Sequence, residues 1–226
     1  TNADGEIEVS EALLVYELDV YIGSISDLSG IENFLNLTHL NCGLNNLTSL
    51  DVSSLVNLQE LKCVNNDIAM LNVNGLTSLQ TLHCAGNELT TIDVSTLTSL
   101  VDLWCSGNLL TTLEVNTLTN LEILDCRFNE LTNLTINLPN LIELDCQENL
   151  LSTLDVNGSP NITTLLCNDN SLQTLSISNL SNLTVLEAQN NELQTLELIN
   201  LIALETLFLF NNELTTLDLS TLTTLE

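Results

Sequence analysis

The sequence predicts a right-handed solenoid, formally an α/β fold, built from stacked copies of one short unit. We expect a parallel β-sheet on its concave face, and short strands, turns and 3₁₀ segments with little helix on its convex face. Leucines recur every 21 residues along most of the 226-residue chain, and a constant period of this length indicates a repeat architecture. Aromatic residues make up only 3% of the chain, although hydrophobic residues make up 44%, so the core must be aliphatic.

The first 36 residues are predicted to form an N-terminal cap that contains a truncated EF-hand-like loop and a first imperfect repeat. An EF-hand loop requires spaced oxygen ligands and a glycine at its sixth position, and Gly5 fills that place in TNADGEIEVSEA. The first ligand of such a loop would precede Thr1. The candidate Ca²⁺ ligands are Asn2, Asp4, Glu6, Glu8 and Glu11. The alternative is an acidic turn that binds no metal.

Residues 37–226 are predicted to form about nine copies of the unit L-x-x-L-x-C-x-x-N-x-L-x-x-L-x-V-x-x-L-x-x. One unit is a residue short, with the deletion at Leu138-Pro139. We expect no C-terminal cap after the last unit. The unit is a leucine-rich repeat. Its segment L-x-x-L-x-C alternates inward and outward as a strand does, so the units should stack into a sheet with strands ~4.8 Å apart.

Two positions of the unit are predicted to lie inside the solenoid. Position 9 is Asn in every regular unit, and its amide can donate to and accept from the backbone of neighbouring turns. Position 6 carries all seven cysteines, which are Cys42, Cys63, Cys84, Cys105, Cys126, Cys146 and Cys167. Equivalent side chains on parallel strands stand near the ~4.8 Å strand spacing, whereas a disulfide requires Cβ atoms ~3.8 Å apart. We therefore expect a ladder of buried, reduced thiols.

Repeats of the form LxxLxCxxNxLTxLDV resemble the cysteine-ladder leucine-rich repeats of internalin J-type bacterial surface proteins and of related secreted repeat proteins of Bacteroidetes. In the latter, an acidic stretch such as DGEIEVSEA, followed by a phrase like ISDLSGIENFLNLTHLNC, similarly precedes the repeats. The resemblance covers nearly the whole chain. It implies a bacterial module, secreted or on the cell surface, that attaches to protein or glycan ligands of a host or the environment.

The outward positions of the strands are predicted to form a concave binding surface. Both histidines, both basic residues, Trp104 and six of the seven aromatic residues fall on these positions. A tryptophan among charged groups can stack on a sugar ring, and Trp and Arg are frequent anchors of protein interfaces. The predicted site consists of Lys62, His83, Asp102, Trp104, Asp125, Arg127 and Asp145. The alternative is a tryptophan that lies on the surface without a role.

This surface predicts an adhesion or binding module that recognises a host or environmental protein or glycoprotein. The alternatives are a polysaccharide-binding module and a rigid spacer in a larger surface protein. A second, apolar patch near the C-terminus predicts contact with a further segment or self-association through that end. Its members are Leu166, Val185, Phe208 and Phe210.

The charge of the chain excludes several classes of partner. Thirty acidic residues stand against Lys62 and Arg127, a net charge of −28, which repels nucleic acids and anionic membrane surfaces. A salty or calcium-rich medium outside a cell would relieve the self-repulsion. The sequence contains no run of 18 apolar residues, so it predicts no membrane-spanning helix. The sequence also lacks a nucleophile with a partner base, a CxxC or HExxH metal-binding spacing and a phosphate-binding loop. An enzyme is therefore not expected, nor any cofactor besides calcium.

Overall fold

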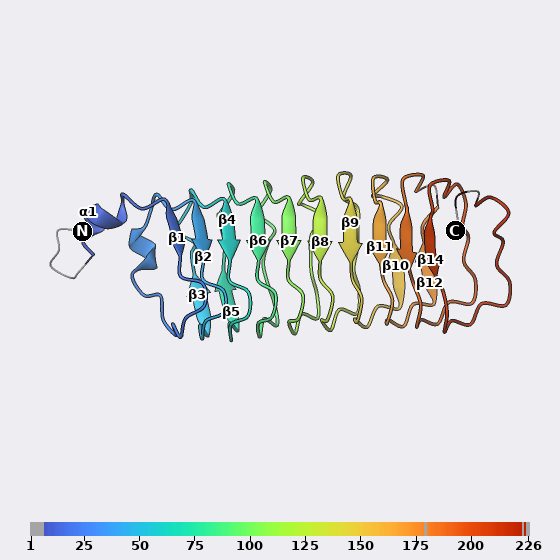
Figure 1. Cartoon of the computed structure of the whole chain (residues 1–226), viewed down its shortest axis with the longest axis horizontal. Helices are drawn as coiled ribbons and strands as arrows, with labels where there is room; N and C mark the ends of the chain where they lie inside the picture. The colour runs from blue at the N-terminus through green and yellow to red at the C-terminus, as the bar shows by residue number, and fades with distance from the viewer. Residues whose placement is uncertain (1–6, 179, 223, 225–226) are drawn as a thin grey trace.

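The computed structural model describes residues 7–178, 180–222 and 224 and shows an elongated solenoid whose coils follow one another along its axis (Figure 1). A ten-stranded sheet runs along one face, and every pair of neighbouring strands in it is parallel. Each strand covers positions 3–5 of its unit. In spatial order the strands are β1 (Glu17–Asp19), β2 (His39–Asn41), β4 (Glu60–Lys62), β6 (Thr81–His83), β7 (Asp102–Trp104), β8 (Ile123–Asp125), β9 (Glu143–Asp145), β11 (Thr164–Leu166), β13 (Val185–Glu187) and β14 (Thr206–Phe208).

The opposite face consists of turns and a few short strands, as predicted. Two parallel pairs form there, β3 (Ser49–Asp51) with β5 (Met70–Asn72), and β10 (Thr153–Asp155) with β12 (Thr174–Ser176). In the described part of the chain, helical turns occur only in the first 36 residues, as α1 (Val9–Ala12) and the 3₁₀ segment Ile31–Asn33. None of the described helices is long and apolar enough to cross a membrane.

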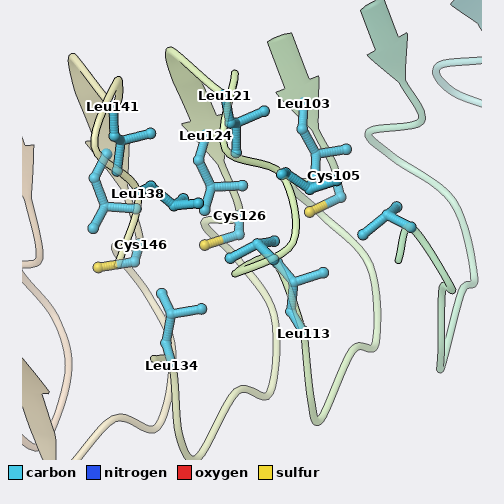
Figure 2. Packing of buried hydrophobic residues seen from close by; sticks show 14 of the residues in the cluster. Leu103, Cys105, Leu113, Leu121, Leu124, Cys126, Leu134, Leu138, Leu141 and Cys146 are labelled. Atoms are coloured by element: carbon cyan, nitrogen blue, oxygen red, sulfur yellow. The ribbon is translucent and has the colours of Figure 1, made fainter. Parts of the chain in front are cut away.

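The core is a set of aliphatic rows that run parallel to the solenoid axis. Figure 2 shows Leu and Cys side chains of successive units directed into the space between the two faces. All seven cysteines are free and fully buried, which confirms the predicted cysteine ladder. Burial raises the pKa of the Cys84 and Cys167 thiols to about 12. The thiols therefore pack as small apolar groups rather than as nucleophiles.

The asparagine row supplies the hydrogen bonds that join successive coils. Asn108 is buried; its Oδ1 accepts the backbone N–H of Leu89 at 3.0 Å, and its Nδ2 donates to the carbonyls of Cys84 at 3.1 Å and Cys105 at 3.0 Å. The same pattern recurs at Asn66 and Asn129. Because an unpaired buried backbone group is costly, only an amide with both donor and acceptor fits this position.

The shortened unit is compensated by the unit that follows it. In regular units the N–H of the leucine at position 19 bonds to a carbonyl three residues back, as Leu118 does to Val115 at 2.9 Å. The deletion leaves Leu138 only two residues after Ile136, so this turn cannot form. The hydroxyl oxygen of the fully buried Ser159, which replaces the position-19 leucine of its unit, accepts the N–H of Leu138 at 2.9 Å instead.

Candidate binding site on the concave sheet

The position-5 side chains form one row across the sheet, because neighbouring strands pair without any shift in register. Lys62 pairs with His83, His83 with Trp104, Trp104 with Asp125, and Asp125 with Asp145. The predicted neighbours are therefore neighbours in the structure, although they lie about 21 residues apart in sequence. Their contacts divide the row into separate groups.

His83, Asp102 and Trp104 form the first group. The imidazole of His83 stacks on the indole of Trp104 with 4.1 Å between ring centroids and 11° between planes. Nε2 of His83 lies 2.9 Å from Oδ2 of Asp102, which holds the imidazole in place. Oδ1 of Asp102 is buried without a hydrogen-bond partner. One face of the indole is thus covered from the side of β6.

The other face of Trp104 borders a hollow over β8 and β9. This hollow has a volume of about 200 Å³, and its lining includes Trp104, Asp125, Arg127, Glu143 and Asp145 but no residue of β6. Since His83 covers the β6 side of the ring, the indole face toward β8 remains available. Trp104 as a whole is 40% exposed. The hollow is the place on this part of the sheet where a ligand group could contact an aromatic face.

Asp125, Arg127 and Asp145 form the second group, which lines the same hollow. The guanidinium of Arg127 lies 3.5 Å from Oδ1 of Asp125 and 3.4 Å from Oδ2 of Asp145. Ser106 donates its hydroxyl to Asp125 at 2.9 Å, and Gln147 donates its side-chain amide to Asp145 at 2.8 Å. Arg127 remains 45% exposed. The group is therefore a pre-oriented set of charges.

Asp145 is the most buried acid of this group, with a side chain 7% exposed. Burial raises the pKa of its carboxyl, and the nearby charge of Asp125 raises the pKa further. Hydrogen bonds from Gln147 and the charge of Arg127 act in the opposite direction. Removing Arg127 would therefore leave two neighbouring carboxylates with less compensation.

Phe128 is an addition to the site that the sequence prediction did not include. It adopts a left-handed backbone conformation with φ of 53°, which is unusual for a bulky residue. Phe128 as a whole is 52% exposed, and its ring centroid lies 5.9 Å from the guanidinium carbon of Arg127. Position 8 is left-handed in each unit from the second to the tenth; its residues are Leu44, Asn65, Gly86, Gly107, Phe128, Glu148, Asp169, Asn190 and Asn211. Since Asn and Gly predominate there, an aromatic residue was a signal that the sequence contained.

Lys62 lies apart from the hollow beside Trp104. Its Nζ is 2.9 Å from Oε1 of Glu60, and it lines a separate hollow of about 250 Å³ with Asp19 and His39. Glu143, in contrast, lines the hollow beside Trp104 although it was not among the predicted residues. The candidate site thus consists of six predicted residues, together with Glu143 and Phe128.

The remaining predicted sites stay predictions. Asn2, Asp4 and Glu6 lie outside the described residues, while Glu8 and Glu11 lie at α1, where the Glu11 carboxylate accepts the backbone N–H of Glu8 at 3.2 Å. Groups of three or more potential metal ligands do not occur among the described residues.

The apolar patch near the C-terminus is only partly continuous. Phe208 and Phe210 are 45% and 58% exposed, but Glu187 lies between Leu166 and Phe208 in the position-5 row. Self-association through this end therefore stays a prediction.

Comparison with known proteins places this geometry among leucine-rich repeats. A family model described as the leucine-rich-repeat domain of the endo-β-N-acetylglucosaminidase EndoS matches residues 11–108. The functional domain of InlJ from Listeria monocytogenes, which includes a cysteine ladder, is similar with a TM-score of 0.91 and 36% identity, over 96% of this chain and 49% of that chain. A leucine-rich-repeat protein of Leptospira interrogans is similar with a TM-score of 0.82 and 29% identity, over 92% and 58%.

These matches confirm the predicted resemblance to InlJ, whereas the relation to Bacteroidetes proteins stays a prediction. The chain spans about half the length of these two solved chains. Comparison with curated protein sequences gives no significant match.

Proposed function

The chain is a leucine-rich-repeat solenoid with a cysteine ladder, and from this premise we propose that it is an extracellular bacterial module that binds a protein or glycoprotein through its concave sheet. The observation that carries the proposal is the hollow beside Trp104, where aromatic and charged side chains from β7, β8 and β9 meet. Trp and Arg in such a setting dominate the energetics of protein interfaces. The chain is 36% identical to the functional domain of InlJ, which includes a cysteine ladder, and the resemblance to internalin J-type surface proteins implies attachment.

The other positions of each unit are needed to form the core and to join the coils. This also favours the outward positions as the binding surface. Positions 1, 4, 6 and 9 form the core and the hydrogen bonds between coils, so the chain can change them little. The outward positions are free of that constraint, and both histidines, both basic residues and six of the seven aromatic residues lie there. The charge of −28 suits a secreted or surface-exposed protein in a medium of substantial ionic strength.

Capture of surface proteins from a host or environmental extract tests this proposal. Trp104→Ala removes the indole and should abolish capture of any partner that the wild-type chain retains, because loss of an interface tryptophan typically costs ~2 kcal/mol or more. Tyr21→Ala, an exposed aromatic at the N-terminal end of the same face, is the matched control and should leave capture unchanged. Equal retention by wild type and Trp104→Ala would exclude this part of the sheet as the binding surface.

A polysaccharide ligand is the second candidate function. Residues 11–108, which include Trp104, match the leucine-rich-repeat domain of EndoS. EndoS is named as an endo-β-N-acetylglucosaminidase, an enzyme that acts on glycans, and this favours a polysaccharide ligand. A glycan array probed with wild type and Trp104→Ala, with and without Ca²⁺, separates this function from protein binding. Binding to neutral glycans that depends on Trp104 would support the polysaccharide-binding function. If no variant of the concave face changed binding to either class of ligand, the rigid spacer would be favoured.

We also propose that the N-terminal loop binds one Ca²⁺ ion, because the carboxylates of Glu8 and Glu11 follow the spacing of an EF-hand loop. Ca²⁺ at millimolar concentration should raise the melting temperature more than Mg²⁺ at equal ionic strength. Glu11→Gln should remove that difference, whereas Glu32→Gln, in the 3₁₀ segment of the same cap, should preserve it. Equal responses of the two variants would count against the site.

A further inference from the structure

The hollow beside Trp104 has a marked excess of hydrogen-bond acceptors. Three carboxylates, those of Asp125, Glu143 and Asp145, line it together with the single guanidinium of Arg127. Ionised carboxylates accept hydrogen bonds and cannot donate them. The guanidinium is already directed at Asp125 and Asp145. The hollow therefore offers more negative charge and more acceptor sites than its own residues compensate.

The indole of Trp104, which lines the hollow, also favours a cationic ligand. The face of an indole carries negative electrostatic potential and attracts cations within about 6 Å of the ring, most strongly for Trp among the aromatic residues. His83 covers one face of Trp104, so the face toward β8 is the one that a ligand can reach. Carboxylates and an indole face together are complementary to a cation on a flexible apolar stem.

The charge of the whole chain acts in the same direction. With a net charge of −28 the molecule repels anionic ligands and attracts basic ones, which raises their rate of association at low ionic strength. A neutral sugar fits this hollow less well, because each of its hydroxyl groups both donates and accepts, and few donors are available here. The acceptor excess thus favours a donor-rich ammonium or guanidinium group.

Phe128 places an aromatic ring next to the charged group of the hollow. Its left-handed backbone belongs to the repeat, because Leu44, Glu148 and Asp169 share it at the same position of their units. The ring is half exposed beside Arg127 rather than packed in the core, so it adds to the contact surface and not to the interior.

We propose that the hollow beside Trp104 receives a lysine or arginine side chain of a protein partner, with its cationic group between the free indole face and the carboxylates of Asp125 and Glu143. The inference rests on the proposed protein-binding function and adds the chemistry of the contact. The partner is therefore a protein with an exposed basic segment. Glu143 serves as a specificity-determining residue, because its carboxylate lines the hollow without belonging to the Arg127 ion pairs.

The test uses the fluorescence of Trp104, the single tryptophan of the chain. The probes are a short Gly/Ser peptide with three lysines, its arginine counterpart, and the same peptide with Nε-acetyl-lysines, titrated at low salt. We expect saturable quenching by the lysine and arginine peptides, and at least about tenfold weaker binding of the acetylated peptide, which lacks the cation. A neutral N-acetylglucosamine oligomer serves as the glycan probe and should not bind.

Two variants with equal changes in net charge locate the contact. Glu143→Gln should weaken binding of the lysine peptide about two- to fivefold, as expected for one partly exposed ion pair. Glu205→Gln removes an exposed carboxylate just before β14 on the same face and should leave the affinity within about 1.5-fold of wild type, since distant surface charges are screened. Trp104→Leu, followed by calorimetry, should abolish binding. Far-ultraviolet circular dichroism verifies the fold of each variant.

Three results would overturn the inference. These are equal affinity for the lysine and acetyl-lysine peptides, equal effects of Glu143→Gln and Glu205→Gln, and quenching by the neutral oligosaccharide alone, which would support the polysaccharide-binding function instead. If no peptide binds while Trp104→Ala still abolishes capture of a protein from extract, the basic side chain is wrong and the proposed function stands. If capture is insensitive to Trp104 while the lysine peptide still binds at the hollow, the proposed function fails at this surface.

Discussion

Individual residues that depart from the repeat carry the specific properties of this protein. Trp104 and Phe128 occupy positions where most units have small or polar residues, and both remain accessible at the concave face. Ser159 departs from the repeat for the opposite reason, because it repairs a backbone defect that the deletion creates in the neighbouring unit. A departure from the repeat therefore indicates function only when the side chain has no structural partner that explains it.

Ser159→Ala tests the repair. The variant leaves the buried N–H of Leu138 without an acceptor, which should lower the free energy of unfolding by about 1–3 kcal/mol. The shift of the urea midpoint measures this loss. Ser54→Ala, an exposed serine in a regular unit, should change the free energy by less than about 0.5 kcal/mol. Similar midpoints for the two variants would show that the hydroxyl of Ser159 is dispensable.

Phe128→Asn tests whether the aromatic ring is kept at the expense of stability. Asparagine tolerates φ of 53° better than phenylalanine does, so the variant should be about 0.5–1 kcal/mol more stable. The reverse change, Asn65→Phe at φ of 53°, should destabilise by a similar amount. Urea unfolding of the two variants measures both effects. A less stable Phe128→Asn variant would mean that the ring contributes packing instead.

At the scale of the element, each three-residue strand is fixed by its neighbours rather than by its own sequence. A single strand of this length has no independent stability, but its Leu and Cys side chains pack on the equivalent side chains of the next coil. The Asn row adds hydrogen bonds between the same coils. Core and hydrogen bonding therefore propagate together from one unit to the next, as in other solenoids.

The cysteine row has a testable consequence for reactivity. Burial raises the pKa of the Cys84 thiol to about 12, so at pH 8 no thiol of the native chain should react with a thiol reagent, whereas all seven should react in denaturant. An unfolded cysteine has a pKa of about 8.5. Because the pKa of the thiol is higher in the folded chain than in the unfolded chain, the protonated thiol favours folding. This contribution to stability is fully present below about pH 8.5 and is lost as the pH rises through about 12.

Urea midpoints measured from pH 8 to pH 11 test that linkage. The midpoint of the wild type should fall as the pH rises, because the unfolded chain binds fewer protons than the folded chain above pH 8.5. Cys84→Ala, which has the residue found at Ala188 in the same row, should show a smaller decrease. Rapid reaction of several native thiols at pH 8 would contradict the buried ladder.

At the scale of the whole molecule, charge and shape act together. Thirty acidic side chains against two basic ones are distributed over an elongated solenoid (Figure 1). Long-range repulsion between them opposes folding, and the concave hollow concentrates part of the field. The same charge that weakens the fold at low ionic strength draws basic ligands toward the sheet.

Added salt should therefore stabilise the chain. Raising NaCl from 20 mM to 500 mM shortens the screening length to a few ångströms. Relief of about 1 kcal/mol of repulsion would raise the melting temperature by about 2–4 °C for a chain of this size. Calorimetry at the two concentrations measures the change. A lower melting temperature at high salt would mean that the ion pairs of Lys62 and Arg127 outweigh the repulsion.

The sequence by itself determined the solenoid, the buried rows and the order of the residues across the concave sheet. Strands that repeat every 21 residues pair in register, so Lys62, His83, Trp104 and Asp125 had to lie side by side. The pairing register of neighbouring strands follows from the repeat period, and the period can be read from a single sequence.

Only the tertiary structure decided which contacts the outward side chains make with one another. His83 covers one face of Trp104, Arg127 lies between Asp125 and Asp145, and Lys62 turns away to Glu60. Such contacts depend on side-chain rotamers and on neighbours a full coil away. Periodicity fixes where a Cβ atom lies, whereas packing and charge fix where the end of the side chain points, and this places the hollow beside Trp104.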